Sequence, residues 1–394
     1  MTGKTEHEKE VVVDPWADIQ GKVDYDKLIK DFGTEKLDEK LIERLTKDAA
    51  KRGLELHHLI RRGVFFSHRD LKWILDEYDK GNKFFLYTGR GSSGEVHLGH
   101  IVPWMLTKWL QDVYGVELWF QITDDEKFLF KQELSLEESN RLAHENALDV
   151  LAVGFDPKKT KIFIDTELSA TLYPIAIQIA KKLNFSTVKA VFGFKPETNV
   201  GSIFYTSMQS VPCILPSVIA KRNIPCLIPY AIDQDAHFRV TRDILPKLGY
   251  YKPAAIHCRF LPSLTGPGKM STTGAEKNST IFMNDDPATV RKKVMKYAFS
   301  GGQETVDLHR KHGGKTDVDM AYQWLTYFEP NDEKLAEIKS KYESGELLSG
   351  ELKQILVDTI VPIILTHQHN RGEARKHIGD VMIKDHAWNT EFKR

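Results

Sequence analysis

The sequence of 394 residues is short of cysteine, of net charge and of long apolar runs. Its three cysteines, Cys213, Cys226 and Cys258, form no CxxC pair, which excludes a disulfide framework and favours a reduced cytosolic setting. No apolar run reaches the ~18 residues of a membrane span and no signal-peptide pattern opens the chain, so we expect neither a membrane span nor export. Lys+Arg and Asp+Glu both number 55, so no overall basic charge indicates nucleic acid, although a local basic patch would suffice for it.

The composition that remains, 41% hydrophobic and 28% charged, is that of an ordinary globular chain. At this length it predicts about two domains. The polar residues 1–10 predict a mobile tail, and the β-branched run at 11–24 predicts a hairpin. Residues 25–77 predict helices whose basic clusters we expect on solvated faces. These basic residues are Lys51, Arg52, Arg61 and Arg62.

Residues 83–100, KFFLYTGRGSSGEVHLGH, predict a nucleotide site. The apolar start predicts a strand over 83–88, the glycines predict a turn over 89–94, and the run 101–114 predicts a helix that Gly115 ends. A strand, a glycine turn and a helix N-terminus together form a phosphate pocket, because backbone N–H groups and the helix dipole both face the anion.

The HLGH tetrad in this segment is more specific than its glycines. The glycines fit GxGxxG, but the third glycine should open the helix, whereas residues 95–97 intervene. His97 and His100, at the start of a helix, project to one side and can donate hydrogen bonds to phosphate, and Gly99 leaves space for a base or a ribose. Two surface histidines that lie together by chance are the alternative that this motif alone leaves open.

The chain after Gly115 alternates strand and helix patterns, which predicts an α/β fold with a mostly parallel sheet. Polar residues directly follow two predicted strands, where open α/β sheets bind ligands: 124–127 (DDEK) and 233–235 (DQD). The second group either caps the next helix or belongs to a site. Gln121, an amide inside an apolar strand, either satisfies neighbouring backbone or faces a polar ligand group. The predicted strands are 116–123, 161–165, 225–232 and 254–260, and the predicted helices are 135–154, opened by a capping box of Ser135 and Glu138, and 171–183.

The loop 265–274 is rich in glycine, proline and hydroxyl groups around Lys269 and Met270. Such a loop can present an ammonium group to a phosphate and close over a triphosphate, and a merely solvated loop is the alternative. Gln209 lies in an apolar helical run beside Met208, where a methionine usually fills the core. From about residue 280 the pattern predicts helices alone.

HLGH before the first nucleotide helix and KMSTT (269–273) on a late loop resemble the two motifs of the class I aminoacyl-tRNA synthetases, in the right order. The longer segments VDPW, RRGVFFSHRD, LYTGRG, QITDDEK, CLIPYAIDQD and DVDMAYQWL resemble the tryptophanyl-tRNA synthetase family of the eukaryotic and archaeal branch. The resemblance runs from about residue 11 to the C-terminus. It departs from the class at Thr272, which replaces the second lysine of the loop motif.

The resemblance implies an enzyme that activates L-tryptophan with ATP and Mg²⁺ to tryptophanyl-adenylate and pyrophosphate, then transfers tryptophan to the 3′-terminal adenosine of tRNA(Trp). It also implies a cytoplasmic homodimer. The Rossmann-like sheet of the class I core would carry an N-terminal extension and an α-helical C-terminal domain. The implied division is a tail (1–10), an extension of hairpin and helices (11–78), a Rossmann-like catalytic domain (79–279) and an α-helical anticodon-binding domain (280–394).

The resemblance also assigns residues to ligands. Tyr87 and Gln121 would hold the indole nitrogen, and Glu126, Gln209 and Gln234 would hold the α-amino group. No metal ligand on the protein is implied, because Mg²⁺ would arrive on the phosphates of ATP. The implied ATP-binding residues are Arg90, Gly91, His97, Gly99, His100, Lys127, Lys269, Met270 and Ser271, of which His97, His100, Lys269 and Ser271 would be catalytic.

Three rivals share some of these features. A tyrosyl-tRNA synthetase would have the same fold and chemistry, and Gln121 argues mildly against it. A small-molecule nucleotidyltransferase could use the HxGH motif but would hardly need the helical C-terminal region. A non-catalytic descendant would usually have lost HLGH or the Lys269 loop, and both are intact.

Overall fold

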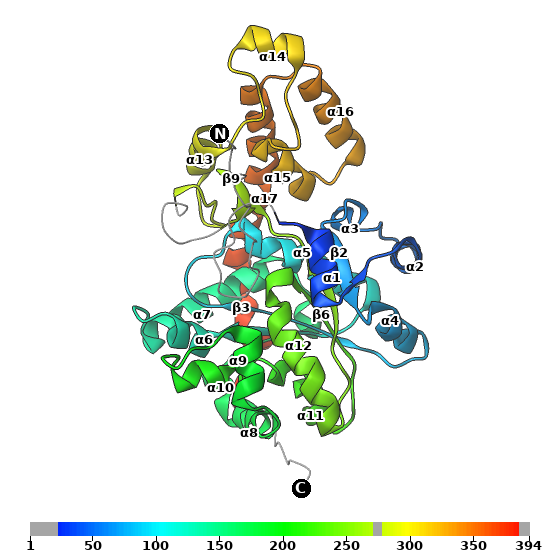
Figure 1. Ribbon diagram of the computed structural model, residues 1–394, viewed down its shortest axis with the longest axis vertical. Helices are drawn as coiled ribbons and strands as arrows, with labels where there is room; N and C mark the ends of the chain where they lie inside the picture. Colours follow the sequence, from blue (N-terminus) through cyan, green and yellow to red (C-terminus); the bar gives the residue numbers. More distant parts are fainter. Residues whose placement is uncertain (1–22, 271–277, 386–394) are drawn as a thin grey trace, which may run out of the picture.

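The computed structural model describes residues 23–270 and 278–385, so the predicted tail and nearly all of the predicted hairpin lie outside the described residues. The described chain is built around an eight-stranded sheet with helices on both faces and a helical region at one end (Figure 1). The strand order is β1-β2-β7-β6-β3-β4-β5-β10. Five of the seven strand pairings are parallel, which confirms the predicted Rossmann-like α/β class.

The sheet changes its winding direction beside β3 (Phe85–Gly91). From β3 the chain proceeds to β4 (Leu118–Thr123) and β5 (Thr160–Ile164) on one side, and later returns to β6 (Cys226–Ala231) and β7 (Ala254–Cys258) on the other. In open α/β sheets the ligand crevice lies outside the carboxyl ends of the strands at such a switch point. The fold therefore places a site at the ends of β3, β4 and β6.

Three short strands extend this sheet at its edges. β2 (Phe65–Arg69) pairs antiparallel with β7, and β1 (Glu35–Lys36) pairs antiparallel with β2. At the other edge β10 (Met382–Ile383) pairs parallel with β5. The sheet thus includes β1 and β2, which precede the segment 79–279, and β10, which follows it. The domain boundaries implied by the resemblance stay a prediction.

Alternation along the strands divides the core into two layers. Leu118 and Phe120 of β4 point into one core, whereas Trp119 packs with Phe85 and Tyr87 of β3 in the other. Residue 121 follows Trp119 at the same spacing of two, so the amide of β4 lies on the face of the second core.

Different helices cover the two faces of the sheet. The first core is supplied chiefly by α2 (Glu39–Ala50), α4 (Leu71–Asp79), α5 (Leu98–Tyr114), α7 (Leu136–Ala152) and the C-terminal helices. The second is supplied by α8 (Ser169–Ala180), α10 (Val200–Met208), α11 (Leu215–Ile219) and α12 (Asp235–Ile244). The remaining helices of this part are α1 (Tyr25–Phe32), α3 (His58–Arg61), α6 (Asp124–Phe130) and α9 (Phe185–Phe192).

The region after residue 280 is helical, as predicted. Figure 1 shows α14 and α16 at one end of the molecule, with α17 running from there into its body. α17 is 33 residues long, packs against α7 and leads into β10. The helices are α13 (Pro287–Tyr297), α14 (Val306–His312), α15 (Met320–Phe328), α16 (Asp332–Glu343) and α17 (Ser349–Val381). Among the described residues, no helix is both long enough and apolar enough to cross a membrane.

Three of the predicted boundaries near the site are wrong. Gly89 and Gly91 belong to β3 and not to a turn, because their backbone pairs with β4. α5 begins at Leu98 instead of residue 101, since the two histidines themselves cap it. The predicted loop at 265–274 begins as a hairpin of β8 (Pro262–Ser263) and β9 (Gly266–Lys269).

The predicted capping box of α7 is half correct. Ser135 Oγ accepts a hydrogen bond from the backbone N–H of Glu138 at 3.1 Å. The Glu138 carboxylate does not reach back to the helix start, because it forms two hydrogen bonds with the guanidinium of Arg141.

Arg61 is exposed, as predicted, whereas Arg62 is half-buried, and both side chains form an ion pair. Both guanidinium groups bind the carboxylate of Asp332 at the start of α16, with Nε–O distances of 2.7 and 2.8 Å. Arg62 also donates to the carbonyl oxygens of Thr326 and Glu329. These contacts tie the N-terminal helices to the C-terminal helical region.

Candidate active site

A cavity of about 280 Å³ lies at the carboxyl ends of β3, β4 and β6. The structure brings together in its walls every predicted site residue that it describes, and Ser271 lies outside the described residues. The roles of these residues stay predictions. They are Tyr87, Arg90, Gly91, His97, Gly99, His100, Gln121, Glu126, Lys127, Gln209, Gln234, Lys269 and Met270.

The two histidines of HLGH cap α5 with their ring nitrogens. His97 Nδ1 accepts from the backbone N–H of Gly99 at 3.1 Å, and His100 Nδ1 accepts from the backbone N–H of His97 at 3.2 Å. Burial lowers the pKa of both imidazoles well below the ordinary value, and Arg90 lowers it further. A neutral imidazole whose Nδ1 is an acceptor carries its proton on Nε2, so each ring keeps one N–H donor. The ring centroids are 3.6 Å apart, so the two donors are neighbours.

The glycines of β3 make room for the ammonium group of Lys127. A Cβ atom at Gly91 would lie 1.7 Å from Lys127 Cε, so only glycine lets this side chain cross the end of the strand. At Gly99 an added Cβ would come within 3.0 Å of the His97 ring, which keeps the first turn of α5 open. The close approach of backbone and donors in this turn suits a phosphate or nucleoside.

Arg90 also supports the structure of the site. Its Nε donates to Asn146 at 2.6 Å, and its Nη2 donates to the carbonyl oxygens of Gly94 and Glu95. The guanidinium therefore fixes the turn that precedes HLGH. Its Nη1 is buried without a protein partner and is the group left for a ligand. Burial lowers the pKa of Arg90 to about 10, so it stays charged at neutral pH.

Lys269, the lysine of the late loop, ends β9 and reaches the cavity. Its Nζ lies 2.5 Å from Asp233 Oδ2 and 5.4 Å from the centre of the Phe260 ring. The other carboxylate oxygen of Asp233 is buried without a partner. Asp233 thus belongs to the site. It does not cap α12, since the N-cap of that helix is Gln234 and no side-chain cap is formed.

Three polar side chains form a hydrogen-bonded group at the apolar end of the cavity. The Tyr87 hydroxyl donates to Gln121 Oε1 at 2.5 Å. Gln209 Nε2 donates to the Tyr87 oxygen at 2.7 Å and lies 3.3 Å from Gln121 Oε1. Burial raises the pKa of Tyr87 well above its ordinary value, so the phenol is neutral. Two oxygen acceptors therefore lie side by side and already receive one N–H group.

Glu126 supplies a negative charge to the same cavity. Burial raises its pKa, but the ammonium of Lys127 and the hydroxyl of Thr123 outweigh that effect and the net pKa is lowered. Thr123 Oγ1 donates to its Oε2 at 2.6 Å and Lys127 Nζ donates to its Oε1 at 3.0 Å. An ionised carboxylate at this position can receive an ammonium group. Gln234 lines the cavity beside it.

Asp165, which directly follows β5, was not among the predicted site residues. Gln121 Nε2 donates to both of its carboxyl oxygens, at 3.0 and 2.9 Å. The signal was available in the sequence, because Asp165 ends a predicted strand in the same way as the polar groups at 124–127 and 233–235.

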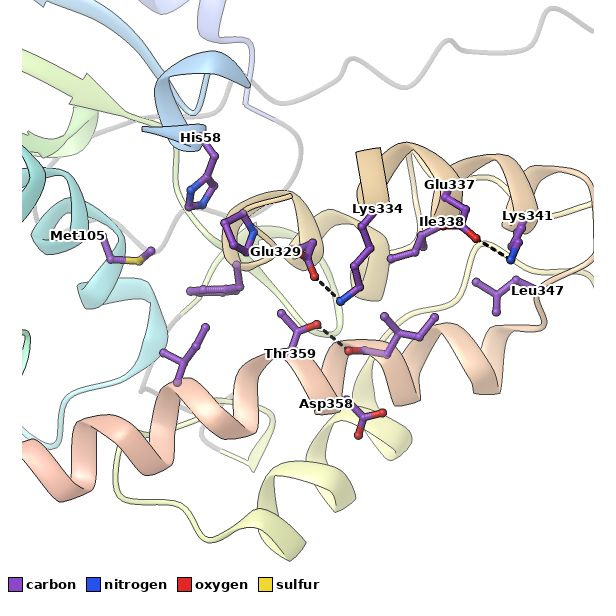
Figure 2. A pocket seen from close by; sticks show the side chains of 14 residues that line it. His58, Met105, Glu329, Lys334, Glu337, Ile338, Lys341, Leu347, Asp358 and Thr359 are labelled. Carbon is purple, nitrogen blue, oxygen red and sulfur yellow. Dashed lines mark hydrogen bonds and ion pairs between the residues drawn. The ribbon is translucent and has the colours of Figure 1, made fainter. Parts of the chain in front are cut away.

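A larger cavity of about 700 Å³ lies elsewhere, between α3, α5 and the C-terminal helices. Figure 2 shows His58 and Met105 on one side of it and Thr359 of α17 on another. Two of its lysines are neutralised by neighbours, as Lys334 binds Glu329 and Lys341 binds Glu337. It contains no predicted site residue.

The fold and the donor set of the smaller cavity define a class I nucleotide-activating core, and comparison with known proteins agrees. The family model described as tRNA synthetases class I (W and Y) matches residues 79–363. The chain belongs to this family of class I tRNA synthetases.

Individual relatives show which synthetases of this family the chain resembles in sequence and in fold. The tryptophan–tRNA ligase of Sulfolobus acidocaldarius is 51% identical over 371 residues, 93% of this chain and 94% of the relative. The cytoplasmic tryptophan–tRNA ligase of Saccharomyces cerevisiae is 46% identical over 393 residues, 96% of this chain and 90% of the relative. The crystal structure of the Plasmodium falciparum tryptophanyl-tRNA synthetase matches with a TM-score of 0.85 at 43% identity, covering 91% of this chain and 97% of that chain. Within the class, the chain is one of the tryptophanyl-tRNA synthetases, as its motifs predicted.

Proposed function

We propose that the chain activates L-tryptophan with ATP and transfers it to the 3′-terminal adenosine of tRNA(Trp). One observation carries the proposal: the phosphate donors of HLGH and of the Lys269 loop line the same cavity as the Tyr87–Gln121 acceptors and the Glu126 carboxylate. The relatives named above are tryptophan–tRNA ligases, which supports the same reaction.

The activation step needs no general base from the protein. The carboxylate of tryptophan is ionised at neutral pH and attacks the α-phosphorus of ATP. The new P–O bond forms as the bond to the bridging oxygen of pyrophosphate breaks, and the electron pair leaves with pyrophosphate. His97 and His100 are neutral, so they stabilise the developing charge as hydrogen-bond donors and do not remove a proton. Lys127, Lys269 and Arg90 would add positive charge around the phosphates.

The transfer step uses the same cavity. A ribose hydroxyl of the terminal adenosine attacks the carbonyl carbon of the adenylate, the C–O bond to AMP breaks, and the hydroxyl proton is released. We assign recognition of the tRNA anticodon to the helical region 280–394. Lys292 and Lys311 are exposed there, whereas Lys293 is bound to Asp285.

Mg²⁺ fits this site as a companion of the phosphates. The cavity wall that would face the triphosphate presents N–H and ammonium groups, and Asp233 is occupied by Lys269. We therefore propose that Mg²⁺ arrives on ATP, where it neutralises charge on the leaving pyrophosphate.

Tryptophan recognition follows from the Tyr87–Gln121–Gln209 group. Indole offers one N–H donor on a large apolar body, and the two oxygen acceptors meet that need. Phenylalanine offers no N–H donor to these oxygens, and a site built to hydrogen-bond a substrate N–H can discriminate by ~10⁴-fold or more without editing. Glu126, Gln209 and Gln234 would hold the α-amino group.

We also propose a homodimer in the cytoplasm. Exposed apolar side chains gather on α8, α9 and α10, which lie together in Figure 1 at the end opposite α14. Val200 is 81% exposed and Tyr173 is 55% exposed, and a second copy could cover both. The three cysteines are free and buried, and the yeast relative is named cytoplasmic.

Aminoacylation tests the whole reaction. With ATP, Mg²⁺ and a tRNA(Trp) transcript, the protein should charge the transcript with labelled tryptophan. Charging with tyrosine on tRNA(Tyr) instead would favour the tyrosyl rival. Adenylate formation with no transfer to any tRNA would support the first step and contradict the second.

A further inference from the structure

The side chain behind the indole acceptors is placed by the register of two strands. Gln121 of β4 pairs with Phe163 of β5. Residue 165 follows Phe163 by two, so it lies on the same face of the sheet, directly past the end of β5. This places the Asp165 carboxyl group next to the Gln121 amide, on the side away from Tyr87.

The two ends of the Gln121 amide have different partners. An amide group can be turned by 180°, and its hydrogen-bond partners decide which end is oxygen and which is nitrogen. The oxygens of Asp165 are acceptors for Gln121, so the NH₂ group must face them, at 3.0 and 2.9 Å. The oxygen of Gln121 must then face Tyr87 and the cavity.

The carboxyl group of Asp165 is buried close to that of Asp125. Burial raises the pKa of both groups. A carboxyl group keeps at least one accepting oxygen whether or not it carries a proton, so Asp165 can receive the NH₂ group of Gln121.

A donor already occupies the place in front of the acceptors. Gln209 Nε2 lies 2.7 Å from the Tyr87 hydroxyl oxygen and 3.3 Å from Gln121 Oε1. An N–H group that approached from the cavity would meet the same two oxygens. With the amide of Gln121 turned round, it would meet an NH₂ group and be repelled.

We propose that Asp165 is a positioning residue for tryptophan: by accepting from the NH₂ group of Gln121 it keeps the amide oxygen directed at the indole N–H. Asp165 does not touch the substrate and acts only through Gln121. The inference rests on the proposed assignment of Tyr87 and Gln121 to the indole.

The test compares tryptophan with benzothienyl-L-alanine, in which a sulfur atom replaces the indole N–H. The readout is the ratio of kcat/KM for the two amino acids in ATP–pyrophosphate exchange. The wild-type protein should prefer tryptophan strongly. In Asp165→Ala the Gln121 amide can rotate, so this preference should fall by about tenfold, the worth of one hydrogen bond. The KM for ATP should stay within about twofold, because the phosphate donors are untouched.

Two further variants separate positioning from general damage. Asp165→Asn offers a carbonyl oxygen to Gln121 and should restore most of the preference for tryptophan. Asp319→Ala is the control, since Asp319 is also buried, lies outside the cavity wall and accepts from Gly301 and Tyr342 but not from Gln121. Its preference should match the wild type. If Asp165→Ala does not fold, Asp165→Leu fills the volume without an acceptor and gives the same readout.

The outcomes distinguish the inference from the proposed function. A wild-type protein with no preference for the N–H group would overturn the assignment of the indole pocket. A wild-type preference that persists undiminished in Asp165→Ala or Asp165→Leu would overturn the role of Asp165 alone. Equal loss in Asp319→Ala and Asp165→Ala would reduce the effect to general damage to the fold and would also contradict the role.

Discussion

At the residue scale, the chemistry of the site depends on neutral histidines with a fixed tautomer. His97 and His100 use Nδ1 to cap α5, and this leaves Nε2–H as the only group that each ring can offer to a phosphate. One interaction thus sets both the start of the helix and the direction of the donor. A charged histidine would lose the cap, because a protonated Nδ1 cannot accept.

His100→Ala should slow tryptophan activation far more than it destabilises the fold. Loss of a transition-state donor costs on the order of 3 kcal/mol, about a hundredfold in rate. Loss of the helix cap costs about 1 kcal/mol. Single-turnover adenylate formation and urea unfolding measure the two effects. A rate near that of the wild type would remove His100 from the reaction.

The motifs of the sequence predicted the donors of the cavity but not their support. HLGH, Gln121 and the lysine of KMSTT could be found because each stands out locally, as a spacing or as a polar residue in an apolar run. Asp165 lies 44 residues from Gln121, and only the pairing of β4 with β5 brings the two together. The Arg90 contacts are hidden for the same reason, since Asn146 is 56 residues away.

At the element scale, α8 depends on a distant residue for its start. α8 has no side-chain cap of its own. Instead the Asp385 carboxylate, from the far end of the described chain, accepts from the backbone N–H groups of Ala170 and Thr171 at 2.6 and 2.8 Å. Asp385 follows β10 and so joins the end of α17 to α8, a helix of the second core.

Asp385→Ala should therefore lower the free energy of unfolding by about 1 to 2 kcal/mol, the cost of a lost N-terminal cap. Asp380→Ala is the matched control. The Asp380 side chain is 77% exposed and lies 3.7 Å from His377, so its removal should change stability by less than about 0.5 kcal/mol. Urea unfolding of both variants measures these two changes in the free energy of unfolding. Equal effects would show that Asp385 does not cap α8.

The alternation of strand and helix patterns in the sequence predicted the central strands of the sheet. It did not predict the strands at the edges. β3, β4, β5, β6 and β7 are apolar runs between helices, which local pattern finds readily. β2 was not predicted, because it lies within a segment of helical pattern and its partner β7 lies far along the chain. The half-buried ion pair of Arg62 was not predicted for a similar reason, because Asp332, its partner, is 270 residues away.

At the scale of the whole molecule, the core buries several histidines in the neutral state. Burial lowers the pKa of His257 to about 3 and that of His237 to about 4. In the unfolded chain both titrate near the ordinary value of 6.5. The stability they confer is therefore complete above about pH 6.5, and it is lost as the pH falls towards the folded-state pKa, because only the unfolded chain takes up the protons.

The free energy of unfolding should fall as the pH is lowered from 6.5 to 4. The contribution of a single histidine to this fall can be measured by substituting it. His257 binds Ser67 and Tyr230, and His257→Gln keeps polar groups there without a titrating ring. The wild-type profile should be steeper than that of the variant by up to about 1.4 kcal/mol per pH unit, the value for one proton. Parallel profiles would show that His257 is not neutral in the folded protein.

The central claim is that one cavity joins ATP to tryptophan, and exchange of labelled pyrophosphate into ATP tests it most directly. The assay contains Mg²⁺ and each of the twenty amino acids in turn, without tRNA. The account predicts exchange with tryptophan alone. Exchange with tyrosine would keep the fold and overturn the pocket assignment, and no exchange with any amino acid by a folded, ATP-binding sample would contradict the activation step itself.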